Sequence, residues 1–318
     1  ARCPPRGRSA ASGGRAPLNM QDFVGRVAVI TGAGGGFGRE FARVAAGLGM
    51  KLALADVDER ALRSTVEEVR AQGAAAFGEA TDVSSSEEVA RLAERTIGEY
   101  GAVHLLFNNA GVGCGGFVWE NGEADWQWVL GVNLMGAVHG LRHFVPRMLA
   151  AEKLGEPSHI VNTASIAGWI TPPLMGVYNV SKHAVVALSE TLHHDLRLAG
   201  SRIGVSCLCP AFVPTGIAGS ERVRPSRLAG EAAPTASMRL AQAGLDKAVA
   251  SGRLTAAQVA QQTFDAIRAG RFYVFTHPQI LPSVRARVDH ALAGLMPADP
   301  YAGKPQTRPE SASPGGKC

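Results

Sequence analysis

Short runs of apolar and β-branched residues alternate along the chain with stretches of helical periodicity. Such runs are typical of strands that are buried on both faces of a parallel sheet. Helical patterns fill the intervals, which is the order of a doubly wound α/β fold. We therefore predict one domain with a parallel sheet of about seven strands and helices on both faces. The strand-like runs cover residues 27–31, 51–55, 74–78, 103–107, 158–163, 203–209 and 271–275.

The two ends of the chain lack this alternation. Residues 1–20 are rich in Arg, Ser, Pro and Gly without an acid, and are predicted to form a disordered basic tail. This composition overlaps with organellar transit peptides. Because an amphipathic pattern is missing, we favour a disordered extension or an upstream start, with Met20 as a natural first residue. Residues 297–318 are predicted to be a second disordered tail, which leaves residues 21–296 as the folded domain.

The net charge of +5 does not indicate a nucleic-acid partner. Four arginines lie in the first twenty residues, and residues 297–318 carry three basic against two acidic side chains. The tails therefore account for the whole excess, and the part between them is neutral. No apolar run approaches the ~20 residues needed to span a bilayer. We expect a soluble, cytoplasmic protein with neither nucleic-acid nor membrane partners.

Five cysteines are an odd number without a metal-binding spacing. We therefore expect no disulfide framework, no metal site and a reducing compartment. Cys207 and Cys209 are expected to face opposite sides of their strand, which would exclude a mutual disulfide and a shared metal. Cys114 is expected to be a small buried thiol.

A glycine-rich turn follows the first strand-like run. VAVIT leads into GAGGGFG, where Gly32, Gly36 and Gly38 are spaced for a tight turn close to a pyrophosphate. The helical pattern that follows would offer its N-terminus to this anion. The second run ends at Asp56, about twenty residues later, where an acid accepts hydrogen bonds from the adenosine ribose. This order of elements predicts a Rossmann-type dinucleotide site.

Asp56 also favours NAD over NADP, because a carboxylate at this position would repel a 2′-phosphate. Gly35, just before the second glycine of the motif, stands where a basic residue could have bound that phosphate. Asp56 could in addition cap the turn that follows it. The sequence therefore predicts NAD as the cofactor and leaves NADP as the less favoured alternative.

Three polar residues farther along could converge on one oxygen atom. Tyr178 and Lys182 are four residues apart in YNVSK, so on a helix they point from the same face. A nearby ammonium favours the phenolate of a tyrosine, whose ordinary pKa is ~10. Ser165, upstream in IVNTAS, adds a hydroxyl. Such a pair is common on helix surfaces and acquires meaning only from the nucleotide-binding turn before it.

Together these motifs give the chain, from about residue 24 to 280, a resemblance to the short-chain dehydrogenase/reductase family. The family's T-G-x-x-x-G-x-G motif appears as TGAGGGFG, and its N-N-A-G motif as residues 108–111. Its structural asparagine matches Asn133, and its serine and Y-x-x-x-K motifs match the three residues above. One departure follows the sixth run, where P-G-x-V-x-T reads PAFVPT. Ala211 and Pro214 there put the usual backbone contacts of the missing glycine in doubt.

The resemblance implies hydride transfer between a secondary alcohol carbon and a nicotinamide. Tyr178 would be the general base in oxidation and the general acid in reduction. Lys182 would lower the pKa of Tyr178 and hold the nicotinamide ribose, and Ser165 would orient the reacting oxygen. Asn133 would fix a water behind Lys182. The implied cofactor-binding residues are Gly32, Gly36, Phe37, Gly38, Asp56, Asp82, Val83, Asn109, Ala110, Gly111, Tyr178, Lys182, Pro210, Val213 and Thr215.

Residues 211–254 form a long connection with weak periodicity, which predicts a substrate lid. Its arginines Arg222, Arg224 and Arg227 could attract a carboxylated or phosphorylated substrate, although a solvated lid surface is the more frequent role. An apolar pocket for a bulky or aromatic secondary alcohol is expected, unless the same side chains pack the lid and a subunit neighbour. The expected walls are residues 112–117, Trp119, Trp169, Ile170, Leu174 and Met175.

Three functions remain open at this point. The first is an NAD-linked secondary-alcohol dehydrogenase, and the second is an NADPH-dependent ketoreductase of the 3-oxoacyl type. The third is a catalytically silent NAD-binding scaffold or redox sensor. The resemblance also implies a homodimer or homotetramer, whose subunits would meet through long helices at about residues 122–150 and 178–199.

Overall fold

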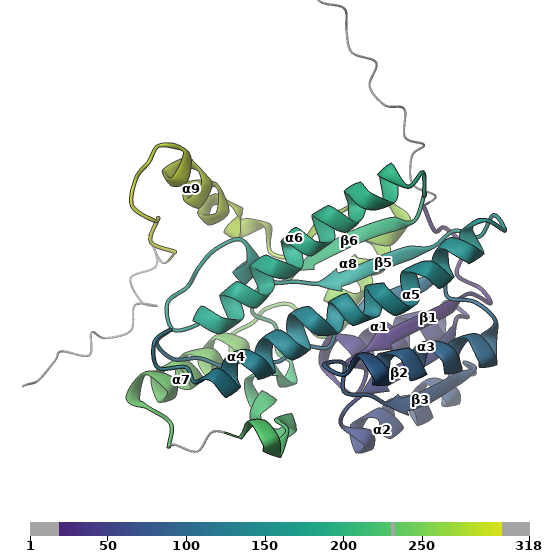
Figure 1. Ribbon diagram of the computed structural model, residues 1–318, viewed down its shortest axis with the longest axis horizontal. Helices are drawn as coiled ribbons and strands as arrows, with labels where there is room; N and C mark the ends of the chain where they lie inside the picture. Colours follow the sequence, from purple (N-terminus) through teal and green to yellow (C-terminus); the bar gives the residue numbers. More distant parts are fainter. Residues whose placement is uncertain (1–18, 230–232, 301–318) are drawn as a thin grey trace, which may run out of the picture.

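A computed structural model describes the protein at residues 19–229 and 233–300. Seven parallel strands form one sheet in the order β3-β2-β1-β4-β5-β6-β7 (Figure 1). The prediction of a doubly wound, seven-stranded parallel sheet is confirmed. The strands are β1 (Val27–Thr31), β2 (Lys51–Asp56), β3 (Ala76–Ala80), β4 (Leu105–Asn108), β5 (His159–Thr163), β6 (Gly204–Cys209) and β7 (Tyr273–Phe275).

Helices cover both faces of the sheet, which is why every residue of β1 is buried. On one face, Phe41 of α1 stacks on Phe107 of β4 at 4.5 Å between ring centroids, and Phe264 of α8 packs against the same ring at 5.6 Å. This face carries α1 (Gly36–Gly47), α2 (Glu59–Ala71) and α8 (Ala256–Arg268). The other face carries α3 (Ser86–Tyr100), α5 (Gly136–Glu152) and α6 (Gly176–Leu198).

The chain reverses its direction of winding between β1 and β4. In such sheets a crevice opens beyond the carboxyl ends of the two central strands, and ligands bind there. Hydrogen bonds tie the two ends together: the Thr31 hydroxyl donates to the Phe107 carbonyl over 3.1 Å, and Asn109 N–H donates back to that hydroxyl over 2.9 Å. The ends of β1 and β4, which form the bottom of the crevice, are therefore held together by hydrogen bonds.

The helical stretch expected at residues 122–150 contains one wide turn. It begins as α4 (Glu123–Leu130), continues through a π-helical turn at Gly131–Met135, and ends as α5. Single π turns inside α-helices occur frequently at functional sites. Here the turn carries Asn133, whose side chain is 3 % exposed.

Two further α-helices lie beyond β6 in the part of the chain that the structure describes. A lid connects β6 to α8 and contains α7 (Ala236–Ala250), which the weak periodicity of residues 211–254 does not predict. After β7, α9 (Leu281–Leu292) projects from the body, and none of its residues is buried (Figure 1). Within residues 19–229 and 233–300, no helix is long and apolar enough to cross a membrane.

The tails predicted at residues 1–20 and 297–318 lie largely outside the described residues. Met20 is an exception, because it is fully buried in the core cluster that contains Phe23. The folded body therefore begins earlier than the predicted boundary at residue 21.

The prediction that Cys207 and Cys209 face opposite sides of β6 is wrong. Side chains alternate along a strand with a period of two, so residues i and i+2 share a face. The two Sγ atoms lie 3.7 Å apart as free, buried thiols. They pack behind Trp169, whose Nε1 donates a hydrogen bond to Cys209 over 3.3 Å.

Candidate active site

Glycines shape the turn between β1 and α1. Gly32 and Gly36 have φ of +67° and +51°, a region that L side chains rarely adopt, and both line a large cavity. Gly38 lies behind the turn rather than on the cavity. A Cβ at Gly38 would stand 2.6 Å from the carbonyl carbon of Gly32. Gly38, predicted to bind the cofactor, therefore acts by letting α1 pack against the turn.

Asp56 ties this turn to the end of β2. Its Oδ2 accepts the N–H of Gly34 over 2.8 Å, and its Oδ1 accepts the N–H of Asp58 over 2.9 Å. Burial raises the pKa of the carboxyl, and these two N–H groups oppose the rise. Asp56 therefore does cap the following turn. Because a carboxylate oxygen has two lone pairs, it keeps acceptor capacity toward the cavity that it lines.

The ends of β3 and β4 supply the next wall of the cavity. Asp82 and Val83 line it after β3, and Asn109, Ala110 and Gly111 line it after β4. The Asn109 amide donates to the Thr31 carbonyl over 2.9 Å, which fixes this wall to the glycine turn.

Asn133 lies behind the cavity rather than on it. Its Oδ1 accepts the N–H of Val112 over 2.8 Å, and its Nδ2 donates to the Val112 carbonyl over 2.9 Å. The same Nδ2 donates to the Ser181 hydroxyl of α6 over 3.0 Å. The Asn133 side chain therefore ties the loop after β4 to the helix that carries Tyr178 and Lys182.

Ser165, Tyr178 and Lys182 meet at the centre of the cavity wall. The Ser165 hydroxyl is near enough to the Tyr178 phenol to lower its pKa. The Lys182 Nζ lies 5.6 Å from the centroid of the Tyr178 ring and donates to the Thr163 carbonyl over 2.9 Å. The structure thus brings together the three residues that the sequence singled out, from the end of β5 and the first turns of α6.

Burial sets the protonation of this group. It raises the pKa of Tyr178 to about 12, which the hydrogen bond with Ser165 opposes. It lowers the pKa of Lys182 to about 8, and the nearby thiols of Cys207 and Cys209 oppose that change. Among the protein's own groups, burial therefore outweighs the lowering of the Tyr178 pKa that was expected from Lys182. The phenol is a protonated donor at neutral pH.

The loop from Pro210 to Thr215 closes the cavity opposite Tyr178. The Pro210 carbonyl accepts the Ser165 hydroxyl over 3.3 Å, and Ala211 N–H donates to Nδ1 of His277 over 3.3 Å. Gly252, at the end of the lid, packs so closely on this loop that a Cβ would lie 2.8 Å from the Phe212 carbonyl oxygen. The unusual PAFVPT loop is therefore fixed from both sides.

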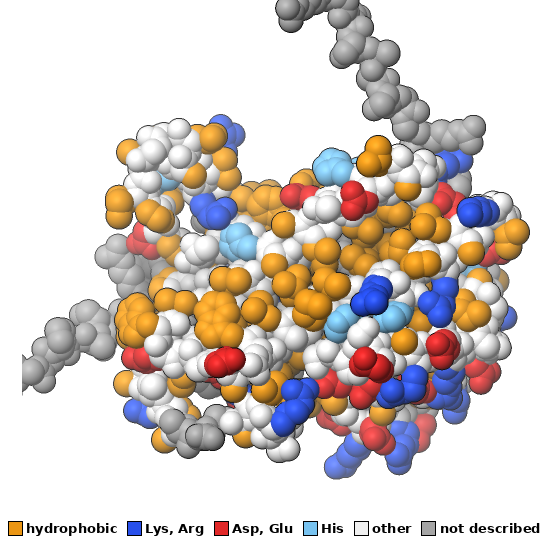
Figure 2. Space-filling view, viewed as in Figure 1, with side chains coloured by type: hydrophobic (Ala, Val, Ile, Leu, Met, Phe, Trp, Pro, Cys, Tyr) orange, Lys and Arg blue, Asp and Glu red, His pale blue; other side chains and the backbone are white. Residues whose placement is uncertain are grey.

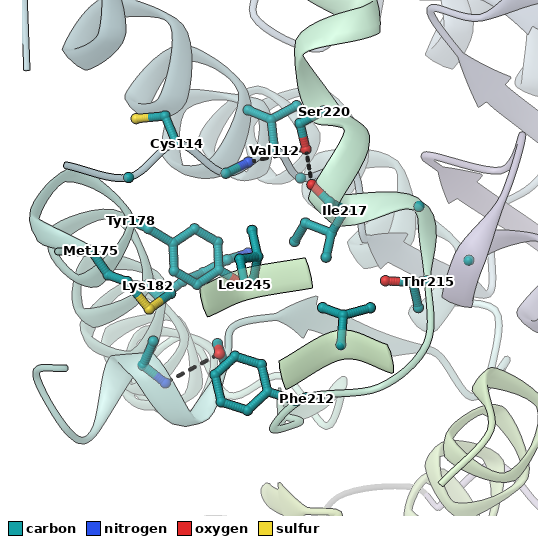
Figure 3. A pocket seen from close by; sticks show the side chains of 18 of the residues that line it. Val112, Cys114, Met175, Tyr178, Lys182, Phe212, Thr215, Ile217, Ser220 and Leu245 are labelled. Atoms are coloured by element: carbon teal, nitrogen blue, oxygen red, sulfur yellow. Dashed lines mark hydrogen bonds between the residues drawn. The ribbon is translucent and has the colours of Figure 1, made fainter. Parts of the chain in front are cut away.

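All these walls belong to one cavity of about 1290 Å³, which extends from the glycine turn to the lid. Every residue predicted to bind the cofactor lines it, with the exception of Gly38. Phe212, Ile217 and Leu245 of the lid lie around the same space as Tyr178 (Figure 3). Such a long cleft, with side-chain-free glycines at one end and the Tyr178 phenol farther along, fits an extended dinucleotide.

The comparison with known proteins decides the family. A family model described as short chain dehydrogenase matches residues 26–225. The chain belongs to this family. A short-chain dehydrogenase/reductase from Burkholderia phymatum in complex with NAD is 57% identical, with a TM-score of 0.86 over 88% of this chain and 99% of that chain. The protein is thus an oxidoreductase of the short-chain dehydrogenase/reductase type.

Two curated relatives are similar over most of their own length. The CLA biosynthesis dehydrogenase/reductase of Lactiplantibacillus plantarum is 34% identical over 280 residues, which are 87% of this chain and 97% of that protein. The C alpha-dehydrogenase of a Sphingobium species is 37% identical over 209 residues, which are 65% of this chain and 67% of that protein.

The substrate side of this short-chain dehydrogenase/reductase differs in part from the expected walls. Trp169 turns away from the cavity and packs edge-on against Tyr273 and Phe275. Trp119 is 76 % exposed and stacks on Phe117 at the surface. Gly116 and Phe117 do not line the cavity either, whereas residues 112–115, Ile170, Leu174 and Met175 do, and lid residues that the sequence did not identify join them. The apolar walls include Val112, Ile170, Leu174, Met175, Ile217, Val223, Leu228, Leu240, Leu245 and Ile280.

The three lid arginines pair with acids of the body, which disfavours the prediction that they attract a substrate anion. Arg224 Nη2 lies 2.7 Å from Asp125 of α4, and both side chains are largely buried. Its guanidinium also covers the Trp128 ring at 4.9 Å. Arg222 and Arg227 make looser, more exposed pairs, with Asp58 at 3.9 Å and with Asp82 at 3.6 Å.

Replacing Arg224 with Ala is expected to loosen the lid. The change leaves Asp125 buried without its cation, although Asp125 still accepts the N–H of Gly122 over 3.0 Å. We expect a cost of roughly 2 kcal/mol, between the values for exposed and buried pairs. Hydrogen exchange should show faster exchange in residues 216–228 and a lower unfolding temperature.

The matched control is Arg222→Ala, because Arg222 is 56 % exposed and 3.9 Å from its acid. Exposed pairs of this kind contribute little to stability. Equal effects of the two substitutions on exchange and unfolding would contradict the anchoring role of Arg224.

Proposed function

We propose that the protein is an NAD-linked dehydrogenase/ketoreductase acting on the CH–OH group of a bulky, apolar secondary alcohol. The observation that carries the proposal is the meeting of Ser165, Tyr178 and Lys182 on one cavity, between the glycine turn and the apolar lid. The glycine turn can hold a dinucleotide, and the lid offers walls for an apolar substrate.

The proposed chemistry follows from the protonation of these residues. The bound nicotinamide would supply the hydride acceptor or donor. In the direction of reduction, the protonated Tyr178 phenol donates its proton to the carbonyl oxygen and becomes a phenolate, and in oxidation the Tyr178 phenolate takes the proton of the alcohol. The Ser165 hydroxyl turns from the Pro210 carbonyl to the reacting oxygen. The cationic Lys182 stabilises the phenolate that forms when Tyr178 gives up its proton.

The residues around the glycine turn support NAD as the cofactor. Asp56 presents a partly buried carboxylate to the cavity, at the place where a 2′-phosphate would have to lie. One observation favours the NADPH alternative: the lid brings Arg222 to 3.9 Å from Asp58, so one cation stands near this end. The Asp56 carboxylate lies closer to the glycine turn than Arg222 does, which is why we favour NAD as the cofactor.

Replacing Asp56 with Asn is expected to weaken the preference for NAD over NADP. Asn keeps one acceptor oxygen for the backbone N–H groups but removes the charge, so the KM for NAD should rise roughly tenfold and that for NADP should fall. Initial rates with the two cofactors measure the change. Asp58→Asn is the matched control, since Asp58 caps α2 through Ala61 N–H at 3.0 Å. A strong wild-type preference for NADPH would contradict our interpretation of Asp56.

A panel of aliphatic and aryl secondary alcohols, followed by the absorbance of NADH, tests the activity itself. Turnover of the apolar members with NAD is the expected result. Bound NAD without turnover of any alcohol or ketone would favour a silent scaffold instead. Turnover of 3-oxoacyl thioesters with NADPH alone would favour the ketoreductase alternative.

We further propose that the protein acts as a cytoplasmic homodimer or homotetramer without nucleic-acid or membrane partners. Hydrophobic side chains spread over the face that α4, α5 and α6 form (Figure 2). Met135 and Val180 on these segments are 40 % and 47 % exposed. Light scattering of the purified protein measures the state.

A further inference from the structure

His277 lies at the rim where the lid, the Pro210–Thr215 loop and the chain after β7 meet. Its side chain lines the cavity although only 9 % of the residue is exposed. No motif of the family assigns it a role, and the resemblance ends near this point. The role of His277 is therefore inferred from the hydrogen bonds of its ring.

The environment of Nδ1 defines the protonation of the ring. Ala211 N–H donates to Nδ1 over 3.3 Å, and the Thr276 hydroxyl lies 2.7 Å from the same atom. A backbone N–H can only donate, so Nδ1 must be the unprotonated acceptor. In a neutral imidazole the proton then resides on Nε2. Burial lowers the pKa of His277, which keeps the ring neutral at pH 7.

The Nε2–H donor of His277 has no hydrogen-bond partner among the residues that the structure describes. Within the described residues, Nε2 of His277 makes no hydrogen bond, yet it is not among the polar atoms sealed from open space. Nδ1 is turned to the loop, so Nε2 on the far side of the ring borders the cavity. An N–H that is open to a cavity and unpaired within the protein is free to donate to an acceptor on a bound ligand.

The position of this donor points to the substrate rather than to the cofactor. The residues that follow it, Gln279, Ile280 and Ser283, line the cavity together with lid helix α7. The residues predicted to bind the cofactor come instead from the ends of β1 to β4, from α6 and from the Pro210–Thr215 loop. The reacting centre is nevertheless close, because the Ser165 hydroxyl donates to Pro210, the neighbour of Ala211.

We propose that His277 is a specificity-determining residue, which donates Nε2–H to a second oxygen on the substrate. The substrate class is then an apolar secondary alcohol or ketone that carries a further acceptor, such as a carbonyl or carboxylate oxygen, away from the reacting carbon. This assignment rests on the proposed function, since it concerns the same cavity.

Matched alcohols test the assignment. The probes are 2-decanol and the methyl esters of 3-, 5-, 7- and 9-hydroxydecanoate, in which a neutral carbonyl lies at increasing distance from the carbinol. We expect the wild-type protein to prefer at least one ester over 2-decanol by about 5- to 10-fold in kcat/KM, the contribution of one hydrogen bond. Equal kcat/KM for all probes would overturn the proposal.

Two substitutions separate the two ring nitrogens. His277→Asn places an acceptor at the Nδ1 position and removes the Nε2 donor, whereas His277→Gln places a donor near the Nε2 position. The ester preference should fall to about one in His277→Asn and persist in His277→Gln. The exposed His194 provides the control His194→Asn, in which the preference should stay at the wild-type value. A loss of NAD affinity with an unchanged ester preference would place Nε2 against the cofactor and refute the assignment.

A second measurement does not require turnover. In 15N-histidine spectra, assigned with His277→Asn, the His277 ring should be the Nε2–H tautomer, and methyl 9-oxodecanoate should shift its Nε2 signal. An Nδ1–H tautomer, or an unshifted Nε2 signal, would overturn the proposal even if the alcohol panel is turned over. If no alcohol is turned over but the signal shifts, the proposed function fails and the binding role stands.

Discussion

Replacing Tyr178 with Phe is expected to lower kcat by about 10³-fold while NADH binding stays within about twofold of the wild-type value. Tyr178 is the general acid–base group of the proposed reaction, and loss of such a group costs typically 10²–10⁴ in rate. Phenylalanine keeps the ring, so its packing 5.6 Å from the Lys182 Nζ is preserved. Initial rates with the best alcohol of the panel and NADH fluorescence titrations measure the two quantities.

The control for this substitution is Tyr273→Phe, which also removes a phenolic oxygen. Tyr273 donates to Glu190 over 2.7 Å near the surface and does not line the cavity. Its activity should remain at the wild-type level. If Tyr178→Phe retained a tenth or more of the wild-type kcat, the proton would have to move through another group, and the assigned mechanism would be wrong.

The strands and the catalytic cluster could be predicted because their signals are local. Each strand-like run lies within about two residues of an observed strand, since burial on both faces demands a continuous apolar run. Ser165, Tyr178 and Lys182 follow fixed intervals, and their helix and strand place them side by side. Where a short stretch of chain determines the structure, a single sequence is informative.

The lid itself was predicted from the long connection, but its internal helix and its contacts were not, for the opposite reason. Helix α7 buries only Ser237 and Val249, so the apolar periodicity that marks a helix is faint. The acids that hold the lid arginines lie far away in the chain, as Asp125 does from Arg224. His277 likewise follows β7 without a motif and acquires its place through Ala211, 66 residues away. Pairing across such distances leaves no pattern in one sequence.

Replacing Gly38 with Ala is expected to remove dinucleotide binding by displacing the turn rather than by touching the ligand. The new Cβ would stand 2.6 Å from the Gly32 carbonyl carbon and 2.9 Å from the Asn109 Nδ2. The first neighbour is backbone, so α1 or the turn must move, at a cost of about 3 kcal/mol or more. Thermal unfolding without NAD and calorimetric titration with NAD measure both consequences.

Gly35→Ala supplies the contrast on the same turn. A Cβ at Gly35 meets no atom within 4 Å, and its φ of -166° is open to any residue. The unfolding temperature of Gly35→Ala should therefore stay near the wild-type value while that of Gly38→Ala falls. If both variants unfold at the wild-type temperature and Gly38→Ala still loses NAD, then Gly38 contacts the cofactor itself. That result would restore the prediction made from the motif and contradict the placement of Gly38 behind the cavity.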